Sequence, residues 1–195
     1  MKKLKNNKGF TLVELLAVIV VLAIVMSLAV VAITGVLDNA RRATFVSEAK
    51  SFLEGARNVV NSDDLISVID RNNVHHLLAC DNPAYATTKI TLDEIPLQQG
   101  GIKSPYGNKY DKLNSYIIVN AKKNGTTCQY EYRIFLYDGI YAIGEVNKPV
   151  EWNSIETGSV NPYTCPYGTN PYTAADNDEN GYPDTCIKQQ DTTTP

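Results

Sequence analysis

Histidine and the common catalytic motifs are scarce in this sequence of 195 residues. Its two histidines, His75 and His76, are adjacent, and the chain has neither a phosphate-binding glycine loop nor a Gly-x-Ser-x-Gly motif. The histidines lie close to Cys80, but this spacing matches no zinc motif, and we interpret them as surface or packing residues. The sequence therefore predicts that the protein is not an enzyme.

An excess of positive charge is also absent. The formal net charge is −3, which gives no electrostatic support for nucleic-acid binding. No proline precedes Pro83, so a helix before that residue has no proline kink, and Gly35 is its weakest point.

The first positive feature is a long apolar run. From Leu15 to Ile33 the only polar side chain is that of Ser27, and as a helix the run can cross a hydrocarbon core of about 30 Å. Four lysines precede it, whereas two arginines, Arg41 and Arg42, follow it. This asymmetry predicts a cytoplasmic N-terminus and an external C-terminal part.

Three interpretations compete for this N-terminus. A secretory signal could be cleaved near Ser27, but the apolar run continues past that residue. A plain membrane anchor fits the length of the run. Neither explains Glu14, because a carboxylate near the start of a membrane span costs roughly 2.5–3.5 kcal/mol, less near the interface, and usually has a partner.

The segment from Lys8 to Leu16 (KGFTLVELL) resembles the prepilin signature of the type IV pilin superfamily. The resemblance implies a leader, residues 1–9, that a prepilin peptidase removes between Gly9 and Phe10, followed by N-methylation of the Phe10 amine. It also implies that Glu14 pairs with the Phe10 ammonium of a neighbouring subunit during assembly. Loss of the four leader lysines would change the charge from −3 to −7.

The function implied by the resemblance is that of a structural subunit of a type IV pilus filament. The implied partners are identical subunits, the prepilin peptidase, an assembly ATPase and a platform protein. The protein would lie in the cell membrane before assembly and in a cell-surface filament afterwards. Two alternatives remain: a pseudopilin of a type II secretion or competence system, and a minor tip pilin with a calcium-dependent adhesive role.

An apolar stripe follows the membrane-length run. Its members recur at three- and four-residue steps: Phe45, Ala49, Phe52, Leu53, Ala56 and Val59. We expect one helix from Phe10 to about Val60, of which residues 10–37 form the transmembrane and filament-core half. The predicted fold class is α+β: this helix packs on an antiparallel β-meander in a globular domain over residues 38–150. A disulfide-bonded calcium-loop region over 151–188 and a mobile tail over 189–195 follow.

The meander is predicted from alternating strands over 116–119, 130–136 and 140–143, with a further strand over 90–97. Asn124-Gly125 and Asp138-Gly139 are the expected hairpin turns. We expect the alternation to bury one face of the sheet, against the long helix. Residues 64–79 are predicted to form a second short helix. The segment from Ser104 to Tyr110 (SPYGNKY) resembles a stretch that precedes the sheet in pseudopilins and several pilins, and we expect a turn there that docks an aromatic ring.

A calcium site is predicted near the C-terminus. Residues 176–184 (DNDENGYPD) place oxygen ligands at loop positions 1, 3, 5 and 9, with glycine at position 6. The expected ligands are Asp176, Asp178, Asn180, the Tyr182 carbonyl and Asp184. An EF-hand would need Glu at position 12, where this chain has Ile187. The alternative is a polar, disordered tail.

The same region more closely resembles a thrombospondin type 3 repeat, across Cys165-Pro166, Asn170-Pro171, the acidic loop and Cys186. That family folds around calcium and has a flanking disulfide, which here implies a bond between Cys165 and Cys186. Cys80 is then left to pair with Cys128, although four cysteines allow three pairings. Disulfides agree with an exported protein.

Overall fold

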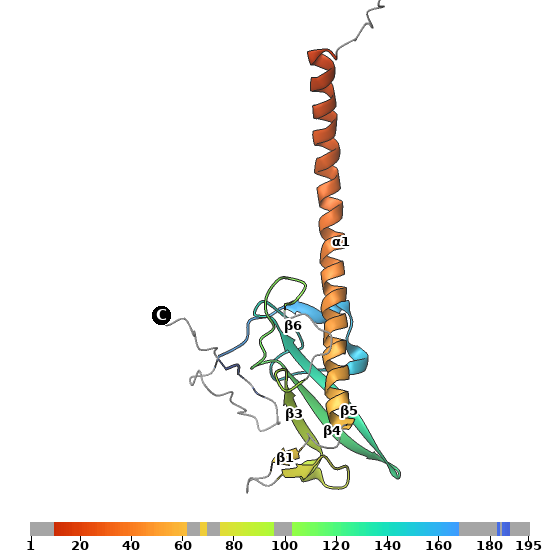
Figure 1. Ribbon diagram of the computed structural model, residues 1–195, viewed down its shortest axis with the longest axis vertical. Coiled ribbons are helices and arrows are strands. Elements are labelled where there is room, and N and C mark those ends of the chain that lie inside the picture. The colour runs from red at the N-terminus through yellow and green to blue at the C-terminus, as the bar shows by residue number, and fades with distance from the viewer. Residues whose placement is uncertain are drawn as a thin grey trace, which may run out of the picture. The chain divides into compact units, whose positions relative to one another are not determined.

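The computed structural model describes residues 10–61, 67–69, 75–95, 103–167, 183 and 185–187. The chain divides into two compact units after Ala40, and each is described by itself. One helix, α1 (Leu12–Asn61), continues from the first unit into the second (Figure 1). It ends next to the position predicted from the apolar stripe.

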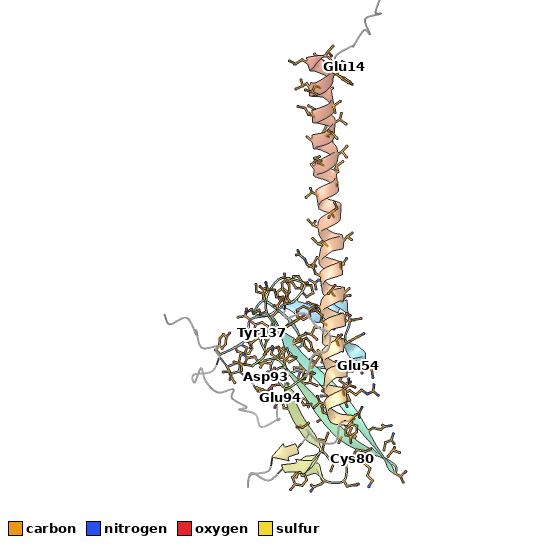
Figure 2. All side chains as sticks on the ribbon, viewed as in Figure 1. Glu14, Glu54, Cys80, Asp93, Glu94 and Tyr137 are labelled. Carbon is orange, nitrogen blue, oxygen red and sulfur yellow. A yellow bond between two sulfur atoms is a disulfide. The ribbon has the colours of Figure 1, made fainter. Side chains whose placement is uncertain are left out.

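The first unit is the apolar part of α1. Its large apolar side chains point to all sides of the helix (Figure 2), and those described are between 48% exposed, at Leu22, and 82% exposed, at Leu12. The hydroxyl of Ser27 donates a hydrogen bond of 2.8 Å to the carbonyl of Ile24, so the one polar side chain in the run is satisfied within the helix. A helix that is apolar all round needs an apolar surrounding to be stable.

The second unit packs the rest of α1 on one face of a six-stranded antiparallel sheet. The strands are β3 (Thr87–Thr91), β4 (Tyr116–Asn124), β5 (Thr127–Tyr137), β6 (Tyr141–Ile143), β7 (Val150–Glu151) and β8 (Val160–Pro162). Their order is β3-β4-β5-β6-β8, and β7 also pairs with β5. Short 3₁₀ helices interrupt the connections: η1 (Pro83–Tyr85), η2 (Trp152–Ser154) and η3 (Thr157–Ser159). The α+β fold class predicted from the sequence is confirmed.

The inner face of the sheet forms the main core with α1. The helix contributes the predicted stripe, in which Phe45, Phe52 and Leu53 are at most 1% exposed. The sheet contributes alternate residues of its two longest strands, including Ile117 on β4 and Ile134 on β5. Burial of one such side chain stabilises a fold by about 1.5–3 kcal/mol, so this contact fixes the second half of α1 on the sheet.

The outer face of the sheet is also buried, which corrects the expectation of a sheet with one buried face. Tyr116, Ile118 and Phe135 point away from α1 and are at most 1% exposed. They pack with Cys165 and Cys186, so the C-terminal segment covers this face. The alternation of apolar and polar residues could not show this, because both alternate sets of β4 are apolar.

The β4–β5 hairpin forms as predicted, with a turn shifted by one residue. Asn124 and Thr127 form the last residue pair of the two strands, so the two loop residues are Gly125 and Thr126. Gly125 has φ +64°, a conformation that only glycine adopts without strain. A positive φ at the first of the two loop residues is common to type I′ and type II′ turns.

The predicted second helix over residues 64–79 is wrong. The described part of that segment contains two short antiparallel strands, β1 (Ser67–Ile69) and β2 (His75–Leu77), paired with each other. The β-branched Val68 and Ile69 favour extended backbone. Asn72 and Asn73 favour turns and interrupt the helical pattern.

Candidate functional site

The start of α1 is a capping box built by Thr11 and Glu14. The Thr11 amide donates to Glu14 Oε2 at 2.9 Å, and the Thr11 hydroxyl donates to the same oxygen at 2.8 Å. In return, the Glu14 amide donates to the Thr11 hydroxyl at 3.3 Å. The box satisfies orphan amide groups of the first helical turn, and the positive end of the helix dipole favours the carboxylate there.

This geometry presents a negative charge at the tip of the apolar first part of α1 (Figure 2). Both bonds from Thr11 go to Oε2, and a carboxylate has lone pairs to spare, so Glu14 can still accept a hydrogen bond from an amine. The predicted pairing of Glu14 with Phe10 concerns a second subunit and stays a prediction. Gly9 and the rest of the leader lie outside the described residues.

The capping box itself was missed in the sequence. The signal was present, because Thr11-Leu12-Val13-Glu14 matches the Ser/Thr-x-x-Glu pattern that begins many helices. The prepilin resemblance implies a role for Glu14 between subunits, whereas the capping box gives it a role within the subunit. Both roles use the same carboxylate.

In the second unit, the segment from Ser104 to Tyr110 docks aromatic rings, as expected. Tyr110 meets Phe45 and Phe52 of α1 edge to face, with ring centroids 5.4 and 5.5 Å apart. Tyr106 stacks on Tyr141 with centroids 3.8 Å apart. Gly107 has φ +93°, which lets the chain turn between the two tyrosines. The segment therefore locks α1 to the β5–β6 end of the sheet.

The Tyr110 hydroxyl donates a hydrogen bond to the carboxylate of Glu48 on α1. Burial raises the pKa of Glu48 above its ordinary value, and the bond from Tyr110 opposes this shift. Burial likewise raises the pKa of Tyr110, and its bond to Glu48 raises it further. This pair is a partly buried polar contact that joins α1 to the segment from Ser104 to Tyr110.

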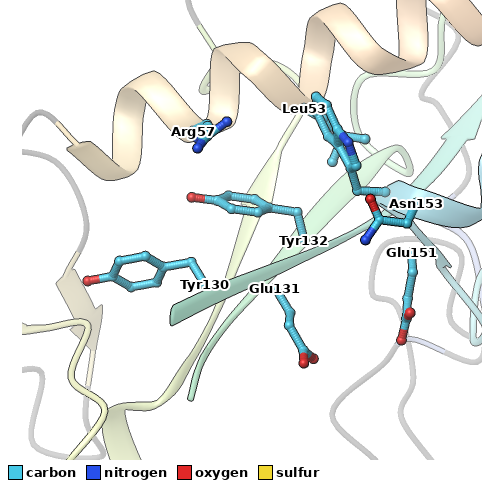
Figure 3. Close-up of a pocket in the computed structure, with 8 residues that line it drawn as sticks. Leu53, Arg57, Tyr130, Glu131, Tyr132, Glu151 and Asn153 are labelled. Carbon is cyan, nitrogen blue, oxygen red and sulfur yellow. The ribbon is translucent and has the colours of Figure 1, made fainter. Parts of the chain in front are cut away.

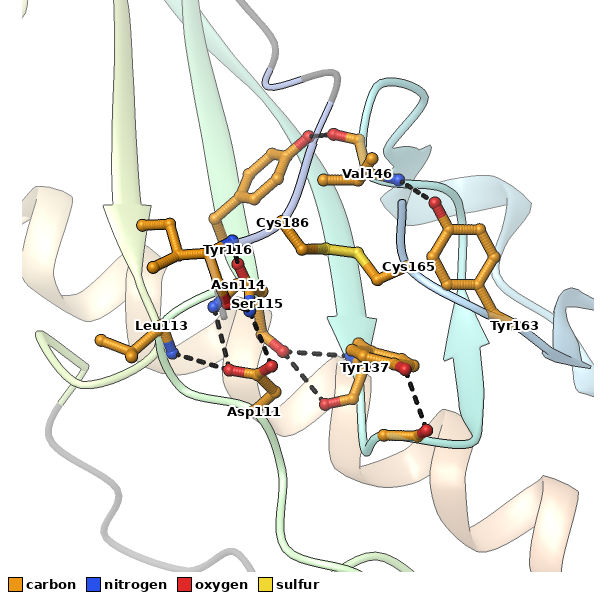
Figure 4. Close-up of a disulfide and its surroundings, with 12 residues drawn as sticks. Asp111, Leu113, Asn114, Ser115, Tyr116, Tyr137, Val146, Tyr163, Cys165 and Cys186 are labelled. Carbon is orange, nitrogen blue, oxygen red and sulfur yellow. Dashed lines mark hydrogen bonds between the residues drawn. A yellow bond between two sulfur atoms is a disulfide. The ribbon is translucent and has the colours of Figure 1, made fainter. Parts of the chain in front are cut away.

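Two disulfides are present, Cys80–Cys128 and Cys165–Cys186, the pairing expected from the sequence. The first joins the segment after β2 to the β4–β5 hairpin. The second lies against the outer face of the sheet (Figure 4).

The segment after the second disulfide is held by Asn114. Its side-chain amide donates to the Ile187 carbonyl at 2.8 Å, and its oxygen accepts from the Ile187 amide at 2.6 Å. Asp111 accepts a further bond of 2.7 Å from the same side-chain amide and so orients it. The sequence gave no signal for this clamp, because Asn114 lies 73 residues before Ile187.

The predicted calcium ligands, Asp176, Asp178, Asn180, Tyr182 and Asp184, lie outside the described residues. Among the residues that are described, no group of three or more His, Cys, Asp or Glu side chains could hold a metal ion. The structure does show that a disulfide closes the segment that carries the predicted ligands.

Comparison with known proteins gives one match. Residues 4–30 match the family model of the prokaryotic N-terminal methylation motif. The chain carries a type IV pilin-like prepilin N-terminus. The matched segment contains Gly9, Phe10, Glu14 and most of the apolar run. No curated protein and no solved structure matches the chain significantly.

This N-terminus indicates a pilin- or pseudopilin-like structural protein, and it implies processing by a prepilin peptidase and an assembly machinery. Among the described residues, α1 is the one helix long and apolar enough to cross a membrane. The prepilin N-terminus and the apolar helix are together consistent with membrane anchoring before assembly.

Proposed function

We propose that the protein is a structural subunit of a type IV pilus filament. The observation that carries the proposal is the start of α1, where a charged Glu14 begins a helix whose apolar side chains are uncovered. An uncovered apolar surface of this extent needs lipid or other protein around it. In a filament, the same surface of identical subunits can provide that cover.

Glu14 has a distinct role in this proposal. A misplaced subunit would leave its carboxylate in apolar surroundings without a cation, whereas a correctly placed one would pair it with the Phe10 ammonium of a neighbour. Removing one partner of a buried pair costs about 3–5 kcal/mol, because the other charge is left uncompensated. The pair would therefore select the register of the subunits.

The test is a comparison of Glu14→Ala and Glu14→Gln with Glu54→Ala, a matched change at an exposed glutamate of the same helix. We expect all three proteins to be processed, with mature chains that begin at Phe10 by N-terminal sequencing. Sheared surface filaments should fall strongly for both Glu14 variants and stay normal for Glu54→Ala. Normal filament yield from Glu14→Ala would contradict the role of Glu14. A mature N-terminus at Val30 would instead favour ordinary secretion.

A pseudopilin of a secretion or competence system is the second candidate, since the methylation motif is common to both classes. Electron microscopy of cells that overexpress the protein separates the two. A major pilin gives long surface filaments. Their absence, together with a processed chain in the membrane, would favour the pseudopilin.

Calcium binding by the C-terminal loop is a separate proposal. It is supported by the oxygen-rich pattern of residues 176–184 and by the Cys165–Cys186 disulfide, which closes a loop around them. Closing the loop lowers the entropy that is lost when several ligands gather on one ion. A calcium-dependent adhesive role at a filament tip depends on this proposal.

A further inference from the structure

The second unit contains a pocket of about 290 Å³ that the proposed function does not use. It lies between α1 and the N-terminal half of β5, next to the β4–β5 turn (Figure 3). Leu53 and Arg57 of α1, Tyr130 and Tyr132 of β5, and Trp152 and Asn153 of η2 line it. Its size is at the lower end of the range of small-molecule sites, roughly 300–1,000 Å³.

Three aromatic side chains are left partly open around this pocket. Trp152 is the only tryptophan of the chain, and it and Tyr132 are half-buried at the edge of the main core. Tyr130 is 38% exposed. Tyr130 and Tyr132 are alternate residues of one strand and so lie on the same face of β5. Aromatic faces carry a partial negative charge, which attracts the weakly positive C–H groups on the apolar face of a sugar ring.

Of the charged side chains around the pocket, the guanidinium of Arg57 is the one best able to bind an anionic ligand. The two acidic residues that border it point away from α1 (Figure 3), and each has a cation: Glu131 pairs with Lys122 at 2.6 Å, and Glu151 with Arg133 at 2.7 Å. The ion pair of Arg57 is much weaker, with Glu54 at 4.0 Å and both side chains more than half exposed. Its guanidinium faces the ring of Tyr132 across the gap (Figure 3).

We propose that this pocket binds an acidic sugar residue of a glycan. The apolar face of the sugar packs on the aromatic side chains that line the pocket, and Arg57 binds the carboxylate through its two parallel N–H groups. The Tyr132 hydroxyl and the Asn153 amide add hydrogen-bonding groups to the lining for the sugar hydroxyls. A terminal or single residue fits the volume better than a long chain does. This inference does not depend on polymerisation, because every lining residue belongs to the second unit of one chain.

Trp152 provides the assay. As the only tryptophan, its fluorescence reports on this pocket alone. The full chain, solubilised in a detergent without sugar groups, would be titrated with methyl β-D-glucuronide and with the neutral methyl β-D-glucoside. We expect a saturable change in emission with the glucuronide and binding at least about tenfold weaker for the glucoside, because the glucoside has no carboxylate to pair with Arg57.

Variants assign the effect to named residues. Arg57→Gln should lose the preference for the glucuronide, and Tyr130→Ala should weaken the binding of both sugars. Lys50→Gln, a change of one exposed charge elsewhere on α1, should change neither. Both lining positions are exposed, and unchanged far-UV circular dichroism would show that the variants fold. Absence of a saturable signal, or an unchanged preference in Arg57→Gln, would overturn the proposal. So would tighter binding of an acidic tripeptide than of the glucuronide, because that would make the pocket a site for a protein segment.

Discussion

Gly55 of α1 offers a sharp test of how the helix packs on the second unit. A Cβ atom added at this position would lie 2.6 Å from Cγ2 of Ile95. Ile95 is 4% exposed and belongs to the main core, and its β-branched side chain cannot easily rotate away. Gly55→Ala therefore places a methyl group where the core has no room.

Two effects of opposite sign decide the outcome. Alanine favours a helix over glycine by about 1 kcal/mol. Overpacking a core costs typically about 1–3 kcal/mol. The cost of the clash should therefore equal or exceed the gain in helix preference. We expect the free energy of unfolding to change by between about 0 and −2 kcal/mol. Ile95→Ala alone should cost about 2–5 kcal/mol. In that background the clash is gone, so adding Gly55→Ala should stabilise the protein by about 1 kcal/mol.

The measurement is a double-mutant cycle by urea denaturation of the full chain in detergent, followed by the fluorescence of Trp152. One kcal/mol moves the midpoint by about 0.3–1 M urea, which is easily resolved. The expected coupling between the two positions is about 1–3 kcal/mol. Equal effects of Gly55→Ala in both backgrounds would refute the contact, and so would stabilisation by Gly55→Ala alone.

Two further predictions concern protons and metal. Because burial holds the pKa of Glu48 above its ordinary value of 4.5, the folded state keeps this proton to higher pH, and stability falls as the pH rises through that window. Glu48→Gln should melt like the wild type at pH 4 but up to a few degrees higher at pH 7; an identical difference at both values would contradict this account. Millimolar calcium should raise the melting temperature, and Asp178→Ala should abolish the shift, whereas Asp93→Ala, an exposed aspartate outside the loop, should not. An unchanged melting curve of the wild type would remove the calcium proposal.

The sequence predicted well what depends on local periodicity. The stripe that begins at Phe45 located the part of α1 that packs on the sheet, and the alternation in β4 and β5 located the hairpin. The helix predicted over residues 64–79 was wrong. The apolar spacing of this segment fits a helix, but its β-branched residues favour strands and its Asn-Asn pair favours a turn between them. Periodicity alone cannot separate the two in so short a segment.

Contacts between segments far apart in the chain could not be predicted from the sequence. The burial of Phe135 on the outer face depends on the return of the C-terminal segment, and the bond pair between Asn114 and Ile187 has no pattern of its own. The same holds for the pocket. Arg57, Tyr130 and Trp152 come from three separate elements, and each is an ordinary surface or edge residue in its own segment. Only the fold brings them together.

The two parts of α1 show what must drive assembly if the protein polymerises as proposed. The second part gains its stability from water-excluding contact with the sheet. The first part, with side chains such as Leu22 uncovered, would start in lipid, which is as apolar as the neighbouring helices that would replace it. Transfer from lipid to protein therefore gains little hydrophobic free energy. Side-chain packing and the charge of Glu14 are what remain to distinguish a correct neighbour from the membrane. A single carboxylate can thus decide assembly on a helix that is otherwise entirely apolar at this end.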